Sequence, residues 1–498
     1  MEEKVALRVT ETGSSFFGHP RGLATLFMTE LWERFSYYGM RALLILFMTA
    51  PAASGGLAFN AAKAGAIYGL FTAAVYGLSL PGGWIADRFL GQRKAVLYGG
   101  AVIAAGNLCL AVPALWSFYA GLVLCAAGAG LLKPNASVMV GQLYSQGDPR
   151  RDAGFSIFYM GINLGAFLAP LACGYLGQRV NWHLGFGLAA TGMTLGLAQY
   201  VADAKYLGEA GLRPAPFADA AEARKHKRGL QLGLATIVSV LGAVTVLDLA
   251  GVIHLTAKTL SDAMGILLLL VVVAFFSWLY STSGWTRVER KRLAVVGVLF
   301  VASALFWCVF EQAGSTLNLF AERSTNKHLL GYEIPASWLQ SLNALFIIAL
   351  APVFAWIWTR LGPREPSSPA KFALGLLAAG LGFAVLAVGA GRASDGAQVS
   401  ALWLVAVYLL HTVGELCLSP VGLSAMTKLA PQKIGGLLMG AWFLSLSVGN
   451  YLGGRIASLY ESFSVVTLFW LVAAVGTGAA LLLAFLVRPT KALMTGVK

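Results

Sequence analysis

The sequence has few charged residues for its length. Asp, Glu, Lys and Arg make up 12% of its 498 residues, whereas 58% are hydrophobic, 58 are Gly and the mean hydropathy is +0.72. Soluble globular domains carry about 25% charged residues. The composition therefore excludes a soluble domain and predicts a polytopic membrane protein.

Cysteine and histidine are also scarce. The five Cys are odd in number and all lie in apolar stretches, so the sequence predicts no disulfide framework. The apolar interior has no His and Asp cluster that could hold a metal, and we expect His411, a lone helix histidine, to be structural. The absence of such a cluster argues against an intramembrane metal enzyme. The N-terminal residues are mixed and polar, so we expect no cleavable signal peptide there.

Long hydrophobic runs dominate the rest of the chain. A membrane-spanning helix needs about 20 apolar residues, and fourteen stretches come close to that length. They lie at about 24–50, 62–86, 95–113, 115–141, 153–177, 184–203, 229–252, 262–281, 293–321, 337–360, 370–391, 400–426, 434–460 and 464–487. The sequence therefore predicts an all-α membrane protein with fourteen transmembrane helices.

The net charge of +14 reflects basic residues in the connections between these stretches. Cytoplasmic loops of membrane proteins are rich in Lys and Arg, so this distribution gives the orientation. With both termini in the cytoplasm, about 26 of the 36 Lys and Arg lie inside, about seven lie outside and three lie in the membrane. The opposite orientation would invert this bias. We therefore expect both termini in the cytoplasm and no nucleic-acid partner.

A short charged loop joins the second and third stretches. Its sequence, PGGWIADRFLGQRKA from Pro81 to Ala95, resembles the loop signature of the major facilitator superfamily, whose core is two six-helix bundles. A degenerate second copy, AWIWTRLGPRE, ends at Glu365. Such a repeat is expected when two halves are related by an axis along the membrane normal. We expect the loop to serve packing and cytoplasmic gating, without contact to a substrate.

The repeat leaves two helices between the halves, and the chain divides accordingly. We expect a peripheral, lipid-facing role for this inserted pair, because its only charges near the membrane lie at its outer turn, such as Asp248 and Asp262. The predicted divisions are an N-terminal segment 1–22, a six-helix bundle 23–203, a linker 204–228, the inserted pair 229–285, a second six-helix bundle 286–488 and a tail 489–498.

Four charged side chains interrupt the first apolar stretch, where charge is most costly. The motif ELWERFSYYGMRA places its polar residues at helical offsets, so they share one stripe. An ionised side chain at the bilayer centre costs at least about 2.5–3.5 kcal/mol. The stripe therefore predicts internal ion pairs or an aqueous cavity, and this helix lines a route or a site. Its members are Glu30, Glu33, Arg34, Tyr37, Tyr38 and Arg41.

Further polar residues interrupt later apolar stretches. They stand in the motifs GAGLLKPN, FSIFYMGINLGAF, FWCVFEQAGSTLNLFAER, SLNALF and HTVGELCLSPVGLSAMTKLAP, and they are Lys133, Asn163, Trp307, Glu311, Asn343 and Glu415. Together with the first stripe, these motifs resemble the proton-dependent oligopeptide transporter family of the major facilitator superfamily. The resemblance runs from about Leu23 to Leu486 and includes the inserted helix pair of bacterial members. It implies two six-helix bundles plus that pair, in a bacterial inner membrane.

The resemblance also implies site residues, none of them catalytic or metal-binding. Proton coupling would fall to Glu30, Glu33, Arg34, Lys133 and Glu311. Substrate binding would fall to Arg34, Tyr37, Tyr38, Arg41, Tyr76, Lys133, Asn163, Trp307, Glu311, Asn343, Glu415 and Trp442. Basic Arg34 and Lys133 suit the peptide carboxylate, Glu415 suits the amine, and aromatic walls accept varied side chains.

Depth along the helices predicts two gate pairs. Arg41 and Glu311 lie about 17 and about 18 residues from the cytoplasmic ends of their apolar stretches, so they can pair when the outer side closes. Lys133 and Glu415 lie about 8 and about 11 residues from the cytoplasmic ends of theirs. They could latch the inner side.

We therefore expect a proton-coupled symporter for di- and tripeptides that needs no cofactor besides the coupling proton. Peptide-like drugs and membrane lipid are further expected partners, and the expected state is a monomer. A family relative that moves nitrate or another small anion is the alternative within the class. An intramembrane metal enzyme is disfavoured, because the sequence has no cluster of metal-binding residues in its apolar stretches. A channel is disfavoured, because it would need a continuous polar path rather than charges matched as gates.

Overall fold

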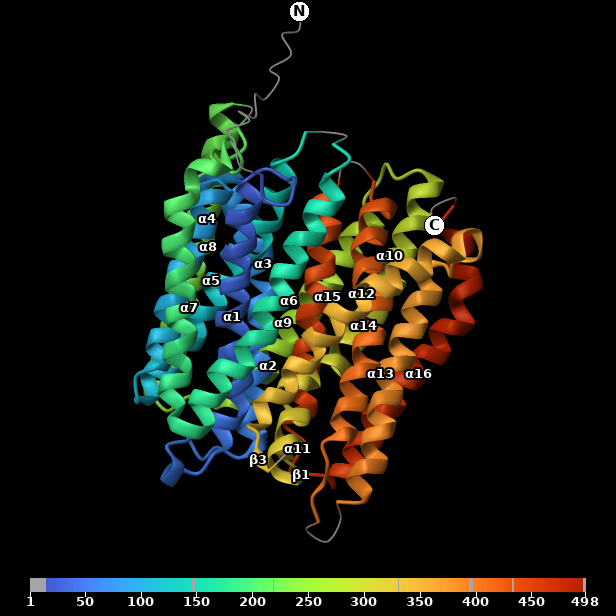
Figure 1. The fold of residues 1–498 in the computed structure, drawn as a ribbon. Coiled ribbons are helices and arrows are strands. Elements are labelled where there is room, and N and C mark those ends of the chain that lie inside the picture. The colour runs from blue at the N-terminus through green and yellow to red at the C-terminus, as the bar shows by residue number, and fades with distance from the viewer. Residues whose placement is uncertain are drawn as a thin grey trace, which may run out of the picture.

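Upright helices build the whole molecule in the computed structural model (Figure 1). The structure describes residues 15–145, 148–217, 219–329, 331–393, 397–431 and 434–495. Within these residues eleven helices are long and apolar enough to cross a membrane by length and composition. Helix α1 is not among these eleven, because it carries four charged side chains, but it packs in the same bundle. The predicted fourteen-helix fold is confirmed.

The N-terminal half contains six helical passes. Asn60 caps the second of them, because its side chain accepts a hydrogen bond from the Lys63 backbone N–H. The passes are α1 (Gly22–Thr49), α2 (Ala61–Gly77) continued by α3 (Ser79–Ile85) and η2 (Ala86–Leu90), α4 (Gln92–Leu110), α5 (Leu115–Gln142), α6 (Arg151–Tyr175) continued by η3 (Leu176–Val180), and α7 (Trp182–Asp203). Short turns η1 (Ala52–Ser54) and η4 (Ala204–Leu207) lie in its connections.

The inserted pair consists of α8 (Ala220–Leu249) and α9 (Ala257–Ser281). Helix α8 begins nine residues before the apolar stretch that predicted it, so the last part of the predicted linker 204–228 is helical. Asp219 caps this start by accepting from the Glu222 backbone N–H, and the basic residues that follow are good helix formers. A helix can therefore continue past the point where its apolar run ends.

The C-terminal half repeats the six-pass pattern. Thr286 and Glu289 form a capping box, which starts its first helix six residues before the apolar stretch. The passes are α10 (Arg287–Phe310) continued by η5 (Glu311–Gly314) and α11 (Thr316–Ser324), η6 (Ala336–Gln340) with α12 (Ser341–Leu361) and η7 (Gly362–Arg364), α13 (Ser368–Gly391), α14 (Leu402–Leu429), α15 (Gly435–Ala457) and α16 (Val465–Leu493). Four two-residue strands lie in its connections, namely β1 (Thr325–Asn326), β2 (His328–Leu329), β3 (Tyr332–Glu333) and β4 (Val399–Ser400), with β1 parallel to β4 and β2 antiparallel to β3.

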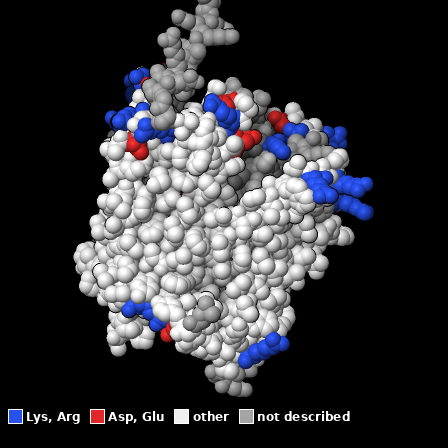
Figure 2. Space-filling view, in the orientation of Figure 1, with Lys and Arg blue, Asp and Glu red and all other residues white. Residues whose placement is uncertain are grey.

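The bundle has two end faces. The terminal face is the one at which α1 begins and α16 ends, at the top of Figure 1, and the opposite face carries β1 and β3. In the view of Figure 2, Lys and Arg gather mainly at the terminal face and almost no charge appears in the belt between the faces. This belt matches the part of the molecule that a bilayer would surround.

The halves meet closely along α2 and α15, and again along α6 and α12. At the first contact, a Cβ on Gly69 would lie 2.7 Å from the Cα of Gly454, so only two glycines allow the backbones to come this near. Further along the same pair, the Ser447 hydroxyl donates to the Ala73 carbonyl at 2.8 Å. The α2–α15 contact therefore forms a tight seam between the halves.

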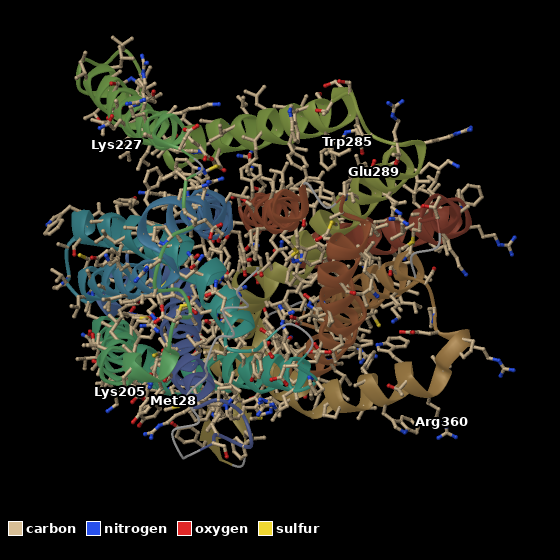
Figure 3. All side chains as sticks on the ribbon, turned by 90° about the horizontal axis from the view of Figure 1, so that it is seen from above. Met28, Lys205, Lys227, Trp285, Glu289 and Arg360 are labelled. Carbon is tan, nitrogen blue, oxygen red and sulfur yellow. The ribbon has the colours of Figure 1, made fainter. Side chains whose placement is uncertain are left out.

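The inserted pair lies along one edge of the bundle and spans both halves, from near Lys227 to Trp285 in Figure 3. Helix α9 buries Leu268 against Ala73 of α2 and against Phe300 and Leu444 of the C-terminal half. The predicted lipid-facing role suits α8, since none of its apolar segment is buried in the protein. It describes α9 only in part, because α9 also packs against both halves. A sequence without intramembrane charge gave no sign of this packing.

The loop motif between α3 and α4 makes polar contacts to its surroundings. Gln92 Nε2 donates to Asp87 Oδ1 at 2.7 Å, and Arg93 Nε donates to the Ala210 carbonyl at 2.8 Å. Arg88 Nη1 lies 3.3 Å from Glu222 Oε1 at the start of α8. The motif thus holds helix ends together on the terminal face and ties the inserted pair to the N-terminal half.

Candidate functional site

The polar stripe of α1 points into the bundle. Glu30, Glu33, Arg34 and Arg41 are all buried, and the Glu33 side chain has no exposed surface. Arg34 Nε donates to Glu30 Oε1 at 2.8 Å and lies 2.7 Å from Glu33 Oε2. One N–H can point at one acceptor, so neither Glu33 oxygen has a hydrogen-bond partner within the described residues. Glu30 Oε2 also lacks a partner among these residues, so the stripe is an ion cluster in which Glu30 is bonded through one oxygen and Glu33 through none.

Lys133 of α5 joins this cluster from the facing side. Its Nζ lies 4.1 Å from the centre of the Tyr76 ring and 4.6 Å from that of Tyr37. Aromatic faces attract a cation, but they do not replace its hydrogen bonds. In the part of the chain that the structure describes, Lys133 Nζ has no hydrogen-bond partner. A buried ammonium without acceptors is costly, so this position suits a group that meets a carboxylate at another stage.

Arg41 and Glu311 form a buried ion pair across the two halves. Arg41 lies on α1, and Glu311 lies at the first position of η5, where α10 ends. Arg41 Nε donates a second hydrogen bond, 2.7 Å long, to the hydroxyl of Tyr68 on α2. The structure thus brings together the two residues of the first predicted gate pair.

A small cavity lies between the halves beside this ion pair. It encloses about 80 Å³, whereas sites that hold small molecules usually enclose about 300–1,000 Å³. Seven of the predicted binding residues line it, namely Tyr38, Arg41, Tyr76, Trp307, Glu311, Asn343 and Glu415. The cavity must therefore widen before it can take a peptide-sized molecule.

The acidic end of the cavity is formed by Glu415 of α14. Asn343 Nδ2 of α12 donates to Glu415 Oε2 at 3.0 Å and lies 3.1 Å from the Thr412 hydroxyl. The amide therefore fixes the carboxylate from one side and leaves its other side toward the cavity. A carboxylate held in this way can receive an ammonium group.

The remaining predicted residues do not line the cavity in this structure. Arg34, Tyr37 and Lys133 lie next to it in the ion cluster described above. Asn163 donates to the Tyr159 carbonyl of its own helix at 2.9 Å. Trp442 packs inside the C-terminal half, with its ring centre 6.4 Å from that of Phe372, and a substrate contact for Trp442 has no support here.

Several lining residues were not predicted. They include Phe310, Gln340, Tyr408 and His411. The His411 ring is buried and lies 5.9 Å from the centre of the Phe310 ring and 5.4 Å from that of Phe383. The sequence did contain one sign of this position. His411 lies one helical turn before Glu415, so the two residues share one face of α14. Phe310, directly before Glu311, carried no comparable polar pattern.

Contacts between the halves close the molecule between the cavity and the opposite face. Asn318 Nδ2 of α11 donates to the Ala42 carbonyl at 2.9 Å, and Ser341 Oγ donates to the Phe167 carbonyl at 2.8 Å. The Ser337 backbone N–H donates to Gln178 Oε1 at 3.0 Å. These bonds lie around the ion pair on the side of the opposite face.

Two exposed acidic residues add to this closure. Glu333 lies 3.3 Å from Arg179 Nη1. Glu461 accepts from the Ala61 backbone N–H at 2.9 Å and from Arg323 at 3.0 Å. Partial burial raises the pKa of Glu461, but the Ala61 amide and Arg323 outweigh burial and hold the pKa below its ordinary value. Glu461 is therefore ionised and joins the halves at neutral pH.

The second predicted gate pair is not formed in this structure. Lys133 lies over two tyrosine rings, and Glu415 accepts from Asn343. Counted from the helix ends, Lys133 lies nine residues from the end of α5, and Glu415 lies fourteen from the end of α14. The five-residue difference corresponds to about 7.5 Å along a helix. The structure therefore has the opposite face closed and this pair apart.

Comparisons with known proteins agree with the fold and the site. The sequence profile of the POT family matches residues 93–475. The chain is 44% identical to peptide transporter YePEPT of Yersinia enterocolitica over 461 residues, covering 90% of this chain and 89% of that protein. It is 37% identical to a di-/tripeptide transporter of Lactococcus lactis subsp. cremoris over 500 residues, covering 98% and 99%.

A solved structure gives the same result. A variant of the peptide transporter POT in complex with alafosfalin matches with a TM-score of 0.90 at 45% identity, and 97% of each chain is covered. The match extends over both halves and the helix pair between them, because so little of either chain is left out. This chain therefore belongs to the POT family of proton-dependent oligopeptide transporters, within the major facilitator superfamily.

Proposed function

We propose that this chain is a symporter that imports di- and tripeptides together with protons, by alternating access between its two halves. The observation that carries the proposal is the cavity between the halves, closed toward the opposite face, with the Arg41–Glu311 pair beside it and an acidic end at Glu415. The names of the relatives support the peptide as substrate. The ion cluster around Glu33 supports the proton as coupling ion.

We place the terminal face in the cytoplasm of a bacterium and the chain in its inner membrane. The excess of Lys and Arg on that face supports this orientation, since positive residues stay on the cytoplasmic side (Figure 2). The opposite face then meets the outside, where peptides enter. Both termini are cytoplasmic in this arrangement, as the even number of passes requires.

The proton is carried by carboxyl groups in the cavity. A carboxyl group can exchange a proton with water while the cavity is flooded, and it keeps its state once the cavity closes and dries. Glu311 faces Arg41 only when the opposite face is closed, so protonation of Glu311 weakens that closure. Glu33 and Lys133 lie together deeper in the N-terminal half, so a proton on Glu33 frees Lys133 to move.

The peptide binds by its two charged ends. Its ammonium lies at Glu415, supported by Asn343, and its carboxylate lies toward Arg34 and Lys133 on the other side of the cavity. The aromatic walls accept side chains of many shapes, because stacking and area burial require little shape specificity. The cavity widens from its contracted volume when the halves move apart on either face.

The alternative substrate, nitrate or another small anion, has no support, since the relatives reported above are named for peptides. A carboxylate at Glu415 also disfavours an anion at that end of the cavity. We further propose that the protein works as a monomer and needs no cofactor. Peptide-like compounds are expected as additional substrates, and membrane lipid surrounds the belt.

Uptake into proteoliposomes tests the proposal. Purified protein in vesicles with a pH gradient, acidic outside, is expected to accumulate a labelled dipeptide above the outside concentration. Unlabelled dipeptides and tripeptides should compete, whereas nitrate and free amino acids should not. Vesicles without protein, and vesicles whose gradient is collapsed by a protonophore, are the controls. Accumulation that nitrate blocks but peptides do not would overturn the proposal.

A further inference from the structure

Tyr68 is a fully buried tyrosine on α2 that the mechanism above does not use. Its hydroxyl accepts the 2.7 Å hydrogen bond from Arg41 Nε, while Glu311 accepts from Nη2 of the same guanidinium. Arg41 and Tyr68 both belong to the N-terminal half, whereas Glu311 belongs to the C-terminal half. The hydrogen bond therefore aims the guanidinium at the place where Glu311 arrives when the halves close.

The same hydroxyl also meets the C-terminal half. Gly314 lies three residues after Glu311, at the end of η5. A Cβ built on Gly314 would lie 1.9 Å from the Tyr68 hydroxyl and 2.9 Å from Arg41 Nε. The closed arrangement thus has room for the hydroxyl only because residue 314 has no side chain. One short turn of the C-terminal half supplies both the counter-ion of Arg41 and the space for its hydrogen-bond partner.

We propose that Tyr68 is a positioning residue of the outer gate and that Gly314 is its matching surface on the other half. Closure of the opposite face then depends on two fits at once, the Arg41–Glu311 pair and the Tyr68 hydroxyl against Gly314. The inference rests on the proposed alternating access, but not on the substrate, because its test is read without peptide.

The direction of the effect follows from water access. In the closed state the Arg41 Nε–H is buried, so loss of the tyrosine hydroxyl leaves it without an acceptor. In the open state water reaches Arg41 and replaces the hydroxyl. Removing the hydroxyl therefore destabilises the closed state more than the open one. Hydrogen bonds to charged groups are strong enough that a shift of about tenfold toward the open state is expected.

A cysteine reporter at Ser337 measures this shift. Ser337 is buried in η6 against Gly174 of the N-terminal half and its hydroxyl has no partner within the described residues, so Ser337→Cys removes no hydrogen bond, and all variants are compared in this background. A membrane-impermeant maleimide reaches the reporter only when the opposite face opens. Four of the five native cysteines are buried, and protein without Ser337→Cys gives the background. The rate of labelling in proteoliposomes is the readout.

Tyr68→Phe keeps the ring and should raise the labelling rate about tenfold. Gly314→Ala should also raise it, because the new methyl group displaces the hydroxyl. The double variant should label more slowly than the product of the two single effects, because the 1.9 Å contact with the hydroxyl is gone and only the 2.9 Å contacts with Tyr68 Cζ and Arg41 Nε remain. Tyr200→Phe is the matched control. It removes another buried hydroxyl of the N-terminal half, bonded to the Arg93 carbonyl at 3.2 Å, and should leave the rate unchanged.

Two results would overturn the inference. Labelling of Tyr68→Phe within twofold of the parent would show that Arg41 needs no positioning. A double variant whose effect equals the product of the two single effects would show that Tyr68 and Gly314 act independently. If Tyr68→Phe does not reach the membrane, Gly314→Ala decides alone, and parent-like labelling of that variant would likewise refute the fit.

Discussion

Replacing Glu311 by Gln tests the central ion pair of the outer gate. The substitution keeps the shape of the side chain and one oxygen acceptor, but it leaves the buried Arg41 charge without a counter-ion when the opposite face is closed. When the opposite face is open, water solvates the same Arg41 charge. Glu311→Gln should therefore favour the state in which the opposite face is open, whatever the substrate.

The size of the shift can be worked from the burial of the pair. Removing one partner of a buried ion pair costs about 3–5 kcal/mol. The low end applies here, because Tyr68 still accepts from Arg41 Nε and the new amide oxygen can accept from Nη2. A cost of about 3 kcal/mol changes an equilibrium about 150-fold. If the open state of the parent has a population of about 1%, it rises to about 60% in the variant.

The Ser337→Cys reporter turns this population into a rate. Labelling from the outside should become about sixtyfold faster in Glu311→Gln, in proportion to the open population. Glu365→Gln is the matched control, because Glu365 is another paired carboxylate of the C-terminal half, bonded to Lys371. It should label like the parent. An increase below about fivefold in Glu311→Gln would refute the view that this pair holds the opposite face closed.

Four further changes test other parts of the site. Glu33→Gln should abolish uptake driven by a pH gradient but keep some peptide counterflow, and undiminished driven uptake would contradict its coupling role. Glu415→Gln should lose much of the preference for a free over an acetylated amino terminus, measured by competition. An equal preference in parent and variant would place the amine elsewhere. Lys133→Ala should increase labelling of a cysteine introduced at the terminal face, whereas increased labelling at Ser337→Cys instead would refute the second latch. Because the lowered pKa of Glu461 keeps its contact above about pH 4.5, Glu461→Gln should raise reporter labelling over the parent by the same factor at about pH 8 and at about pH 5.5. A factor that falls toward one by about pH 5.5 would contradict this sign.

The sequence predicted the stripe of α1 because its polar residues stand out from apolar neighbours. In such a background, helical spacing alone shows which residues share a face. The same contrast marked Lys133, Glu311 and Glu415. Depth counted along the apolar stretches also matched Arg41 to Glu311, although α10 begins six residues earlier than its stretch. The membrane end of a helix, not its first residue, is the useful reference for depth.

Residues without such contrast could not be assigned from the sequence. Tyr68 stands in a helix of small and apolar residues, so nothing marked its face. The resemblance predicted Trp442 as a binding residue, whereas in this structure its ring packs against that of Phe372 and does not line the cavity. The burial of α9 was missed for a similar reason, since an apolar helix reads the same against lipid and against protein. The only polar sign, Asp262, pairs with Arg455 of α15 at 2.6 Å.

The contacts that close the opposite face differ greatly in strength, and this difference explains how one proton can control them. The exposed Arg179–Glu333 pair contributes about 0–1 kcal/mol, because water and salt screen it. The exposed Arg323–Glu461 pair lies within the C-terminal half and holds the Glu461 carboxylate that accepts from the Ala61 N–H of the other half. The Arg41–Glu311 pair lies out of water, where breaking it costs about 3–5 kcal/mol. Neutralising Glu311 therefore removes more than the exposed contacts together can supply. A gate built this way opens on protonation of one buried carboxyl group, while the exposed contacts guide the halves back into register.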